Sequence, residues 1–302
     1  MATAVTLSEE ESWAAVRDRN RVRDLLLVAR RNPVGVFGLF IAIVFVVLGV
    51  FGPFIAPYSP SEIEVTNQFA GPSWAHPFGT DSLGQDILSR TIAGARISLI
   101  IATAAVVIGV GGGAMVGIVS GYYGGVVDSF IQRTGEAGAA FPGLFLYLML
   151  IAAMGQGVNT IITGIAIFAF IGGSRVLRAL VLVLKQATFV EASRSMGASE
   201  SRILIQHILP NVLPIVIVVA TGAIGGAILA EAALSFLGIG VEPGTPSWGI
   251  DLSANYETAA LLGKWHLIAF SGGAISLVVL GFNLLGDTLR DVLDPRLRGS
   301  LN

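Results

Sequence analysis

Several long stretches of this 302-residue chain contain no charged side chain, and the three longest each exceed a single membrane span. They lie between Arg31 and Glu62, between Arg96 and Asp128, and between Glu136 and Arg175. A helix needs about 20 apolar residues to cross a bilayer, and a backbone surrounded by lipid must satisfy its own hydrogen bonds. Because the chain is also 54% hydrophobic and only 13% charged, with a mean hydropathy of +0.78, we predict an all-α protein that crosses a membrane several times.

The uncharged runs and their breaks predict six transmembrane helices. The run that follows Glu136 is too long for one span, and Gly155-Gln156-Gly157 divides it. Asp81 is expected to cap a short helix over 82–90, and Pro295 to end the last helix. The expected spans are 33–57, from 96 to about 123, about 138–154, about 159–177, about 211–235 and about 265–286. The remaining segments are an N-terminal tail (1–32), loops at 58–95 and 239–264, and a C-terminal tail (291–302), so that 96–290 form the helical core.

The distribution of positive charge predicts the orientation of these spans. Lysine and arginine accumulate in the cytoplasmic loops of membrane proteins. In the six-span arrangement fifteen of the eighteen lysines and arginines fall on one side, and Arg90, Arg96 and Lys264 fall on the other. We therefore expect both termini and the polar segment at about 186–210 to lie in the cytoplasm, with 58–95 outside.

Glycines repeat every four residues in the second span. Residues four apart share one face of a helix, and small residues let two helices approach closely in lipid. A similar spacing recurs in the fifth span at Gly222, Gly226 and Ala230. The second-span repeat predicts a helix-packing face made of Gly109, Gly113, Gly117 and Gly121.

The longest polar interruption in the second half of the chain is FVEASRSMGASESRILIQHILPN, from Phe189 to Asn211. The sequence predicts a short helix that ends at Gly197, because glycine accepts the left-handed conformation that closes many helices. Ser199 or Ser201 could cap a second segment, which would lead into the fifth span.

This stretch resembles the EAA loop of ABC-importer permeases. Glu191, Ala192, Gly197 and the pair Leu209-Pro210 stand at that motif's spacing, whereas Ser193 replaces its second alanine and His207 stands where the general pattern has isoleucine. In that family the loop forms a coupling helix that sits in a groove of a cytoplasmic ATPase. The resemblance therefore implies that the ATPase-coupling residues are Phe189, Val190, Glu191, Ala192, Ser193, Met196, Gly197 and Ala198.

The likeness extends over nearly the whole chain from about residue 33. It includes HPFGTD at 76–81, GYYGG at 121–125, EAALSFLG at 231–238, PSWG at 246–249 and NLLGD at 283–287, although Ser271 stands where the family often has proline. These motifs resemble the dipeptide, oligopeptide and nickel permeases of the DppC/OppC type, which have a type I ABC-importer permease fold.

The resemblance implies a multi-pass protein of a bacterial or archaeal inner membrane that works in an assembly. A second homologous permease would complete the path, two cytoplasmic ATPase subunits would bind ATP and magnesium, and an extracytoplasmic binding protein would deliver substrate. Di- or oligopeptides are the expected substrates, and nickel, glutathione or an oligosaccharide are the alternatives.

The residues themselves argue against several other functions. The chain lacks a Walker A motif and cysteine, its three histidines are scattered, and its net charge of −2 does not favour nucleic acid. We therefore expect no cofactor or metal on this chain and no enzymatic activity of its own. A secondary transporter would show inverted repeats, and none is evident. Glu231 is the one acidic residue placed within an expected span, and we expect it to lie at the outer boundary or to line a gate.

Overall fold

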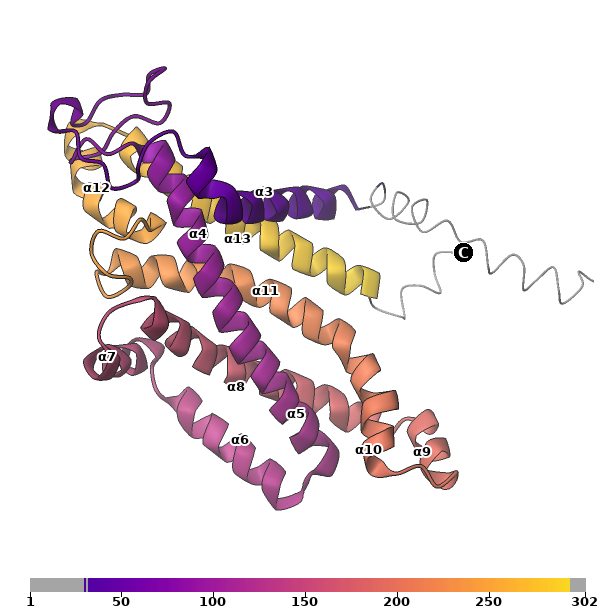
Figure 1. Cartoon of the computed structure of the whole chain (residues 1–302). Helices are drawn as coiled ribbons and strands as arrows, with labels where there is room; N and C mark the ends of the chain where they lie inside the picture. Colours follow the sequence, from indigo (N-terminus) through magenta and orange to yellow (C-terminus); the bar gives the residue numbers. More distant parts are fainter. Residues whose placement is uncertain (1–29, 31, 294–302) are drawn as a thin grey trace, which may run out of the picture.

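The structure is a computed structural model that describes residue 30 and residues 32–293, and every regular element in that part of the chain is helical (Figure 1). Long apolar helices determine the architecture. The first of them, α3, begins at Pro33, where the missing N–H of proline costs nothing because the first N–H groups of a helix have no partner within it. The α-helices are α3 (Pro33–Ile55), α4 (Ile87–Val106), α5 (Gly112–Tyr123), α6 (Gly125–Ala140), α7 (Gly143–Met154), α8 (Val158–Leu184), α9 (Thr188–Ser195), α10 (Glu200–Ile203), α11 (Leu209–Phe236), α12 (Trp248–Leu262) and α13 (His266–Leu293). Two π-helical turns, Val107–Gly111 and Leu204–Ile208, join α4 to α5 and α10 to α11.

Five uninterrupted helical segments are long and apolar enough to cross a membrane, and a sixth span exists if the bent pair α6 and α7 is counted as one. The all-α polytopic fold is thus confirmed. The five segments are Pro33–Ile55, Ile87–Tyr123, Val158–Leu184, Glu200–Phe236 and His266–Leu293. The last helix runs beyond the expected end at 286 and past the start of the expected tail at 291. Pro295 and nearly all of the N-terminal tail lie outside the described residues.

The second span begins at residue 87 rather than at 96, so the loop expected over 58–95 ends at residue 86. Asp86, not Asp81, caps this helix, and its carboxylate accepts a bond from the Ser89 N–H at 2.8 Å. The Asp81 carboxylate instead accepts from backbone N–H groups of the turn before the helix. Arg90 does not mark the membrane boundary because Asp251 neutralises its guanidinium inside the fold.

The third expected span, 138–154, is not one straight helix. α6 ends at Ala140, α7 begins at Gly143, and their axes differ by 91°. Pro142 explains the break, because proline disfavours helical geometry at the residue before it, and Phe141 is extended with ψ of 129°.

The expected loop at 239–264 contains a helix, α12. The Ser247 hydroxyl caps this helix by accepting from the Gly249 N–H at 3.3 Å. Trp248, Asp251 and Asn255 follow at helical spacing and are all buried. Their mixed polarity hides the helix from a hydropathy reading, because part of its buried face is polar.

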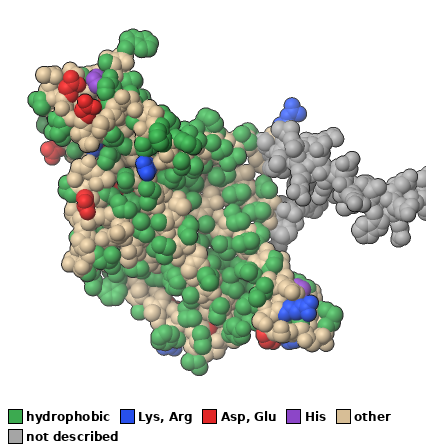
Figure 2. All heavy atoms as spheres, viewed as in Figure 1, with side chains coloured by type: hydrophobic (Ala, Val, Ile, Leu, Met, Phe, Trp, Pro, Cys, Tyr) green, Lys and Arg blue, Asp and Glu red, His purple; other side chains and the backbone are tan. Residues whose placement is uncertain are grey.

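The molecule has two polar ends and an apolar middle. α12 and the segment before α4 form one end, whereas α9 and α10 lie at the far side, near which α3 begins and α13 ends (Figure 1). Charged side chains gather mainly at these two ends, and hydrophobic groups cover the body between them (Figure 2). We call the two ends the α12 end and the α9 end. Phe45, Trp248 and Phe282 centre the core nearer the α12 end, where the Phe45 ring lies 6.0 Å from the Trp248 ring and 5.9 Å from the Phe282 ring.

Candidate functional site

The C-terminus of α9 is closed by a glycine in the left-handed region, as the sequence predicted. Gly197 has φ of 80°. Its N–H donates to the Arg194 carbonyl at 3.0 Å, and the Ala198 N–H donates to the Ser193 carbonyl at 3.1 Å. These two bonds form a Schellman motif, which sets the direction in which the chain leaves the helix. Among the described residues no neighbour lies within 4 Å of a methyl group added at Gly197, so its requirement for glycine comes from the backbone.

The eight residues expected to contact an ATPase lie on different faces of this short segment. Val190 and Ser193 are buried against the helix bundle, and Ala198 is half-buried. Glu191, Ala192 and Gly197 are exposed, as are the larger side chains of Phe189 and Met196, the latter 81% exposed. The inward residues therefore anchor α9, and the outward ones form a surface available to another protein.

The two departures from the EAA pattern touch each other. The Ser193 hydroxyl donates to the Phe189 carbonyl at 2.8 Å and lies 3.3 Å from His207 Nε2. The rings of Phe189 and His207 are 6.3 Å apart. An alanine and an isoleucine could not make this polar contact. His207 thus ties α9 to the start of the long helix that follows.

A second contact ties α9 to α5. The Tyr122 hydroxyl donates to Glu200, and the Arg194 guanidinium donates to the same carboxylate at 3.3 Å. The Glu200 carboxylate also raises the pKa of Arg194. Below these groups Val190 packs in an apolar cluster with Leu177, Val181 and other buried residues of α5, α8 and α11. α9 is therefore held by polar contacts at Ser193 and Arg194 and by an apolar cluster to which α5, α8 and α11 contribute.

The segment after α9 is more continuous than the sequence indicates. α10, the π-helical turn and α11 together make one helical segment of 37 residues, Glu200–Phe236. Pro210 has no N–H to bond to the carbonyl of residue 206, and a wider π turn directly before it accommodates this loss. A polar hollow of about 500 Å³ opens beside α9 between Lys185, Glu191 and Arg194.

The glycine repeat of the second span faces the backbone of α8. A methyl group added at Gly109 would lie 2.6 Å from the Ala166 carbonyl oxygen, and one added at Gly121 would lie 2.9 Å from that of Arg178. Gly113 and Gly117 face the carbonyls of Phe170 and Ser174 even more closely. The four glycines therefore meet four residues of α8 that are themselves four apart. Beside the fifth-span glycines Gly222 and Gly226, by contrast, an added methyl would meet open space.

Glu231 lies near the α12 end and is completely buried. Its carboxylate accepts bonds from the hydroxyls of Ser98 at 2.9 Å, Ser235 at 2.9 Å and Ser247 at 2.8 Å. These serines come from α4, α11 and the cap of α12. The side chain therefore joins three elements within this chain, and a position at the outer boundary or along a gate stays a prediction.

Sequence reasoning missed a buried ion pair at the α12 end. The Arg90 guanidinium donates to the Asp251 carboxylate from Nε at 2.9 Å and from Nη2 at 2.5 Å, and to Gln85 at 2.7 Å. This pair links residues 161 positions apart. The signal that could have identified it was Asp251. In the sequence PSWGID this residue follows the Ser247 cap by about one helical turn.

Among the described residues no group of three or more histidine, aspartate and glutamate side chains could hold a metal ion. At the α9 end the structure provides a short helix that is anchored to the bundle on one side and exposed on the other.

Comparison with known proteins agrees with this arrangement. Residues 113–299 match the family described as "Binding-protein-dependent transport system inner membrane component", and residues 22–72 match the "N-terminal TM domain of oligopeptide transport permease C". Glutathione transport system permease proteins GsiD from Escherichia coli O6:K15:H31, Shigella boydii serotype 4 and Shigella dysenteriae serotype 1 are each 42% identical over 271 residues, which cover 89% of this chain and 89% of each relative. Permeases of this kind generally work with an ATPase and a binding protein. The chain is thus a multi-pass protein of the bacterial inner membrane and belongs to the binding-protein-dependent inner-membrane components, the permease subunits of ABC importers.

Proposed function

We propose that this permease forms half of the translocation path of an ATP-driven importer of di- or oligopeptides. A second homologous permease forms the other half, two cytoplasmic ATPase subunits bind ATP and magnesium, and an extracytoplasmic protein delivers the substrate. This chain itself carries no cofactor and hydrolyses no ATP. Both termini and α9 lie in the cytoplasm in this proposal, as the excess of arginine and lysine on that side favours.

The observation that carries the coupling role is the two-sided placement of α9. Val190 and Ser193 anchor it to the bundle, while Glu191, Ala192 and Met196 stay exposed. A partner that moves this exposed face would move α5, α8 and α11 with it, because all three hold the anchor. ATP-driven closure of the ATPases would in this way switch the bundle between inward-open and outward-open states.

Glutathione is the second candidate substrate, because the relatives that are 42% identical are named glutathione permeases. It is itself a short peptide, so both candidates share a backbone with amide and carboxylate groups.

The test is uptake into vesicles that contain the assembled importer and its binding protein. Labelled dipeptides, tripeptides and glutathione are offered in parallel, with ATP inside or omitted. We expect ATP-dependent accumulation of at least one of these solutes. Accumulation of nickel or an oligosaccharide instead would refute the substrate class, and uptake driven by an ion gradient without ATP would refute the mechanism.

A further inference from the structure

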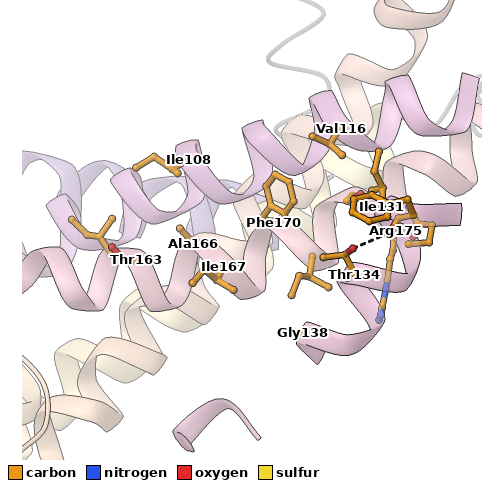
Figure 3. A pocket seen from close by; sticks show the side chains of 16 residues that line it. Ile108, Val116, Ile131, Thr134, Gly138, Thr163, Ala166, Ile167, Phe170 and Arg175 are labelled. Carbon is orange, nitrogen blue, oxygen red and sulfur yellow. Dashed lines mark hydrogen bonds between the residues drawn. The ribbon is translucent and has the colours of Figure 1, made fainter. Parts of the chain in front are cut away.

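An apolar groove of about 580 Å³ lies between α5, α6 and α8 in the membrane-spanning part of the molecule. Ile108 and Thr163 line one end, Phe170 and Ile167 line the middle, and Arg175 stands at the other end (Figure 3). The glycines of α5 hold α8 close along one edge, while α6 departs from the bundle and leaves the groove open between them.

The groove has the length of a lipid tail. Its lining on α8 runs from Ile162 to Arg175, which at about 1.5 Å per residue is about 20 Å. One leaflet contributes about 15 Å of hydrocarbon to a bilayer. The groove is therefore long enough to hold an extended hydrocarbon chain along its apolar lining.

One end of the groove is built for a polar group. Arg175 is exposed and has no hydrogen-bond or ion-pair partner among the described residues, although Arg178, one turn further along α8, is paired with Asp128 at 2.5 Å. Ser174 also lines this end. Its side chain is only 4% exposed, and its hydroxyl makes no hydrogen bond within the described structure. An exposed positive charge thus stands at the end of an apolar channel.

The polar end lies at the depth of a lipid headgroup. Arg175 follows the start of α8 at Val158 by 17 residues, which is about 26 Å along the helix axis. The hydrocarbon core is about 30 Å thick, so the guanidinium reaches the far boundary by extending along its own stem. In the proposed orientation this is the cytoplasmic boundary, where basic groups between helices bind anionic headgroups.

We infer that this groove binds an anionic phospholipid of the cytoplasmic leaflet. One acyl chain occupies the channel, and the phosphate pairs with Arg175. The bound lipid covers the flank of α6 and α8 that this chain leaves open. Only the choice of leaflet rests on the proposed orientation.

The test uses the assembled importer, reconstituted in nanodiscs of equal parts phosphatidylglycerol and phosphatidylcholine and released for native mass spectrometry. We expect phosphatidylglycerol to be retained in preference to phosphatidylcholine. Arg175→Gln should lower that retention by about fivefold, the effect of one basic residue near a membrane surface. Arg175→Lys should restore most of it, and Thr163→Phe should lower retention of both lipids by filling the channel. Arg133→Gln removes an exposed arginine of α6 that does not line the groove and should change nothing.

Equal retention by the wild type and Arg175→Gln would overturn the inference, and so would an equal loss in Arg133→Gln, which would indicate diffuse attraction to the surface. A photo-reactive side chain at position 163 separates lipid from protein as the occupant. Cross-linking to lipid supports the inference, and cross-linking to the second permease overturns it. Lipid retention is measured without ATP or substrate, so it can be interpreted even if the uptake experiment fails.

Discussion

Replacing Gly109 with alanine should weaken the contact that the π-helical turn before α5 makes with α8, although alanine is normally the better helix former. The added methyl would lie 2.6 Å from the Ala166 carbonyl oxygen and 2.6 Å from the Ala169 methyl. An ordinary van der Waals contact begins at about 3.4 Å, so the helices must separate by about 0.8 Å. Such overpacking costs about 1–3 kcal/mol, and the carbonyl cannot rotate away as a side chain could.

Gly111 provides a matched control within the same π-helical turn. It has φ of −61° and ψ of −51°, and an added methyl would meet nothing within 4 Å. Alanine gains about 1 kcal/mol over glycine in a helix at either position. Gly111→Ala should therefore be neutral or stabilising by up to about 1 kcal/mol, whereas Gly109→Ala should be destabilising by as much as about 2 kcal/mol after the same gain is subtracted.

The assay is thermal unfolding of the purified importer in detergent, followed by size-exclusion chromatography after heating. We expect the midpoint of Gly109→Ala to fall by a few degrees relative to Gly111→Ala, given about 2–4 °C per kcal/mol for chains of 150–250 residues. If the two variants unfolded at the same temperature, the close approach of the glycine face to α8 would not contribute to stability, and the packing argument would be wrong.

Three further perturbations test other parts of the molecule. Single cysteines at the exposed positions Ser61, Ser199 and Ser253 should react with an impermeant thiol reagent in intact cells at 61 and 253 only, and labelling of 199 from outside would reverse the orientation. Glu191→Ala and Gly197→Val should leave the permeases paired but lower ATPase copurification or transport per ATP. Glu191→Ala removes an exposed anion, and Gly197→Val places a side chain on a backbone with φ of 80°, at a cost of about 1–2 kcal/mol. Ser201→Ala is the control, and wild-type behaviour of both variants would show that α9 does not couple the ATPase to transport. Asp251→Asn removes the nearest anion from the buried Arg90, whose other carboxylate neighbour, Asp81, lies 4.0 Å away. It should cost as much as about 3–5 kcal/mol, detected as a lower melting midpoint that Arg90→Met partly restores in the double variant. An unchanged midpoint for Asp251→Asn would show that the ion pair does not hold α12 in place.

Helix ends could be predicted from the sequence where a single residue restricts its own backbone. Pro33 begins α3, and Gly197 ends α9, because each residue restricts the backbone by its own covalent structure. The glycine repeat similarly identified a face that meets another helix, although the repeat alone could not name α8 as its neighbour. The same spacing at Gly222 and Gly226 meets open space, which shows that spacing does not by itself determine contact.

The missed features depend on partners far away in the chain. Arg90 was assigned to the loop before the second span, because nothing nearby in sequence indicates that Asp251 neutralises it. α12 was read as a loop, because its buried face is partly polar and the partner of Asp251 comes from a distant helix. The three serines that bind Glu231 could not be identified from the sequence, because two of them come from other elements. Burial of charge and polarity is a tertiary property, and hydropathy along the chain cannot report it.

The continuity of the helix from Glu200 to Phe236 makes it a lever arm. Glu231 lies 31 residues beyond Glu200, about 46 Å along the axis. Each degree of tilt about the α9 end therefore displaces Glu231 by about 0.8 Å. Ser235 lies on the same helix as Glu231 and moves with it, whereas Ser98 and Ser247 lie on other elements. Their bonds to Glu231 measure 2.9 Å and 2.8 Å, and both are lost once the oxygen–oxygen distance grows by about 0.7 Å. A rigid tilt of about one degree at the α9 end would thus be enough to stretch these two bonds at the α12 end.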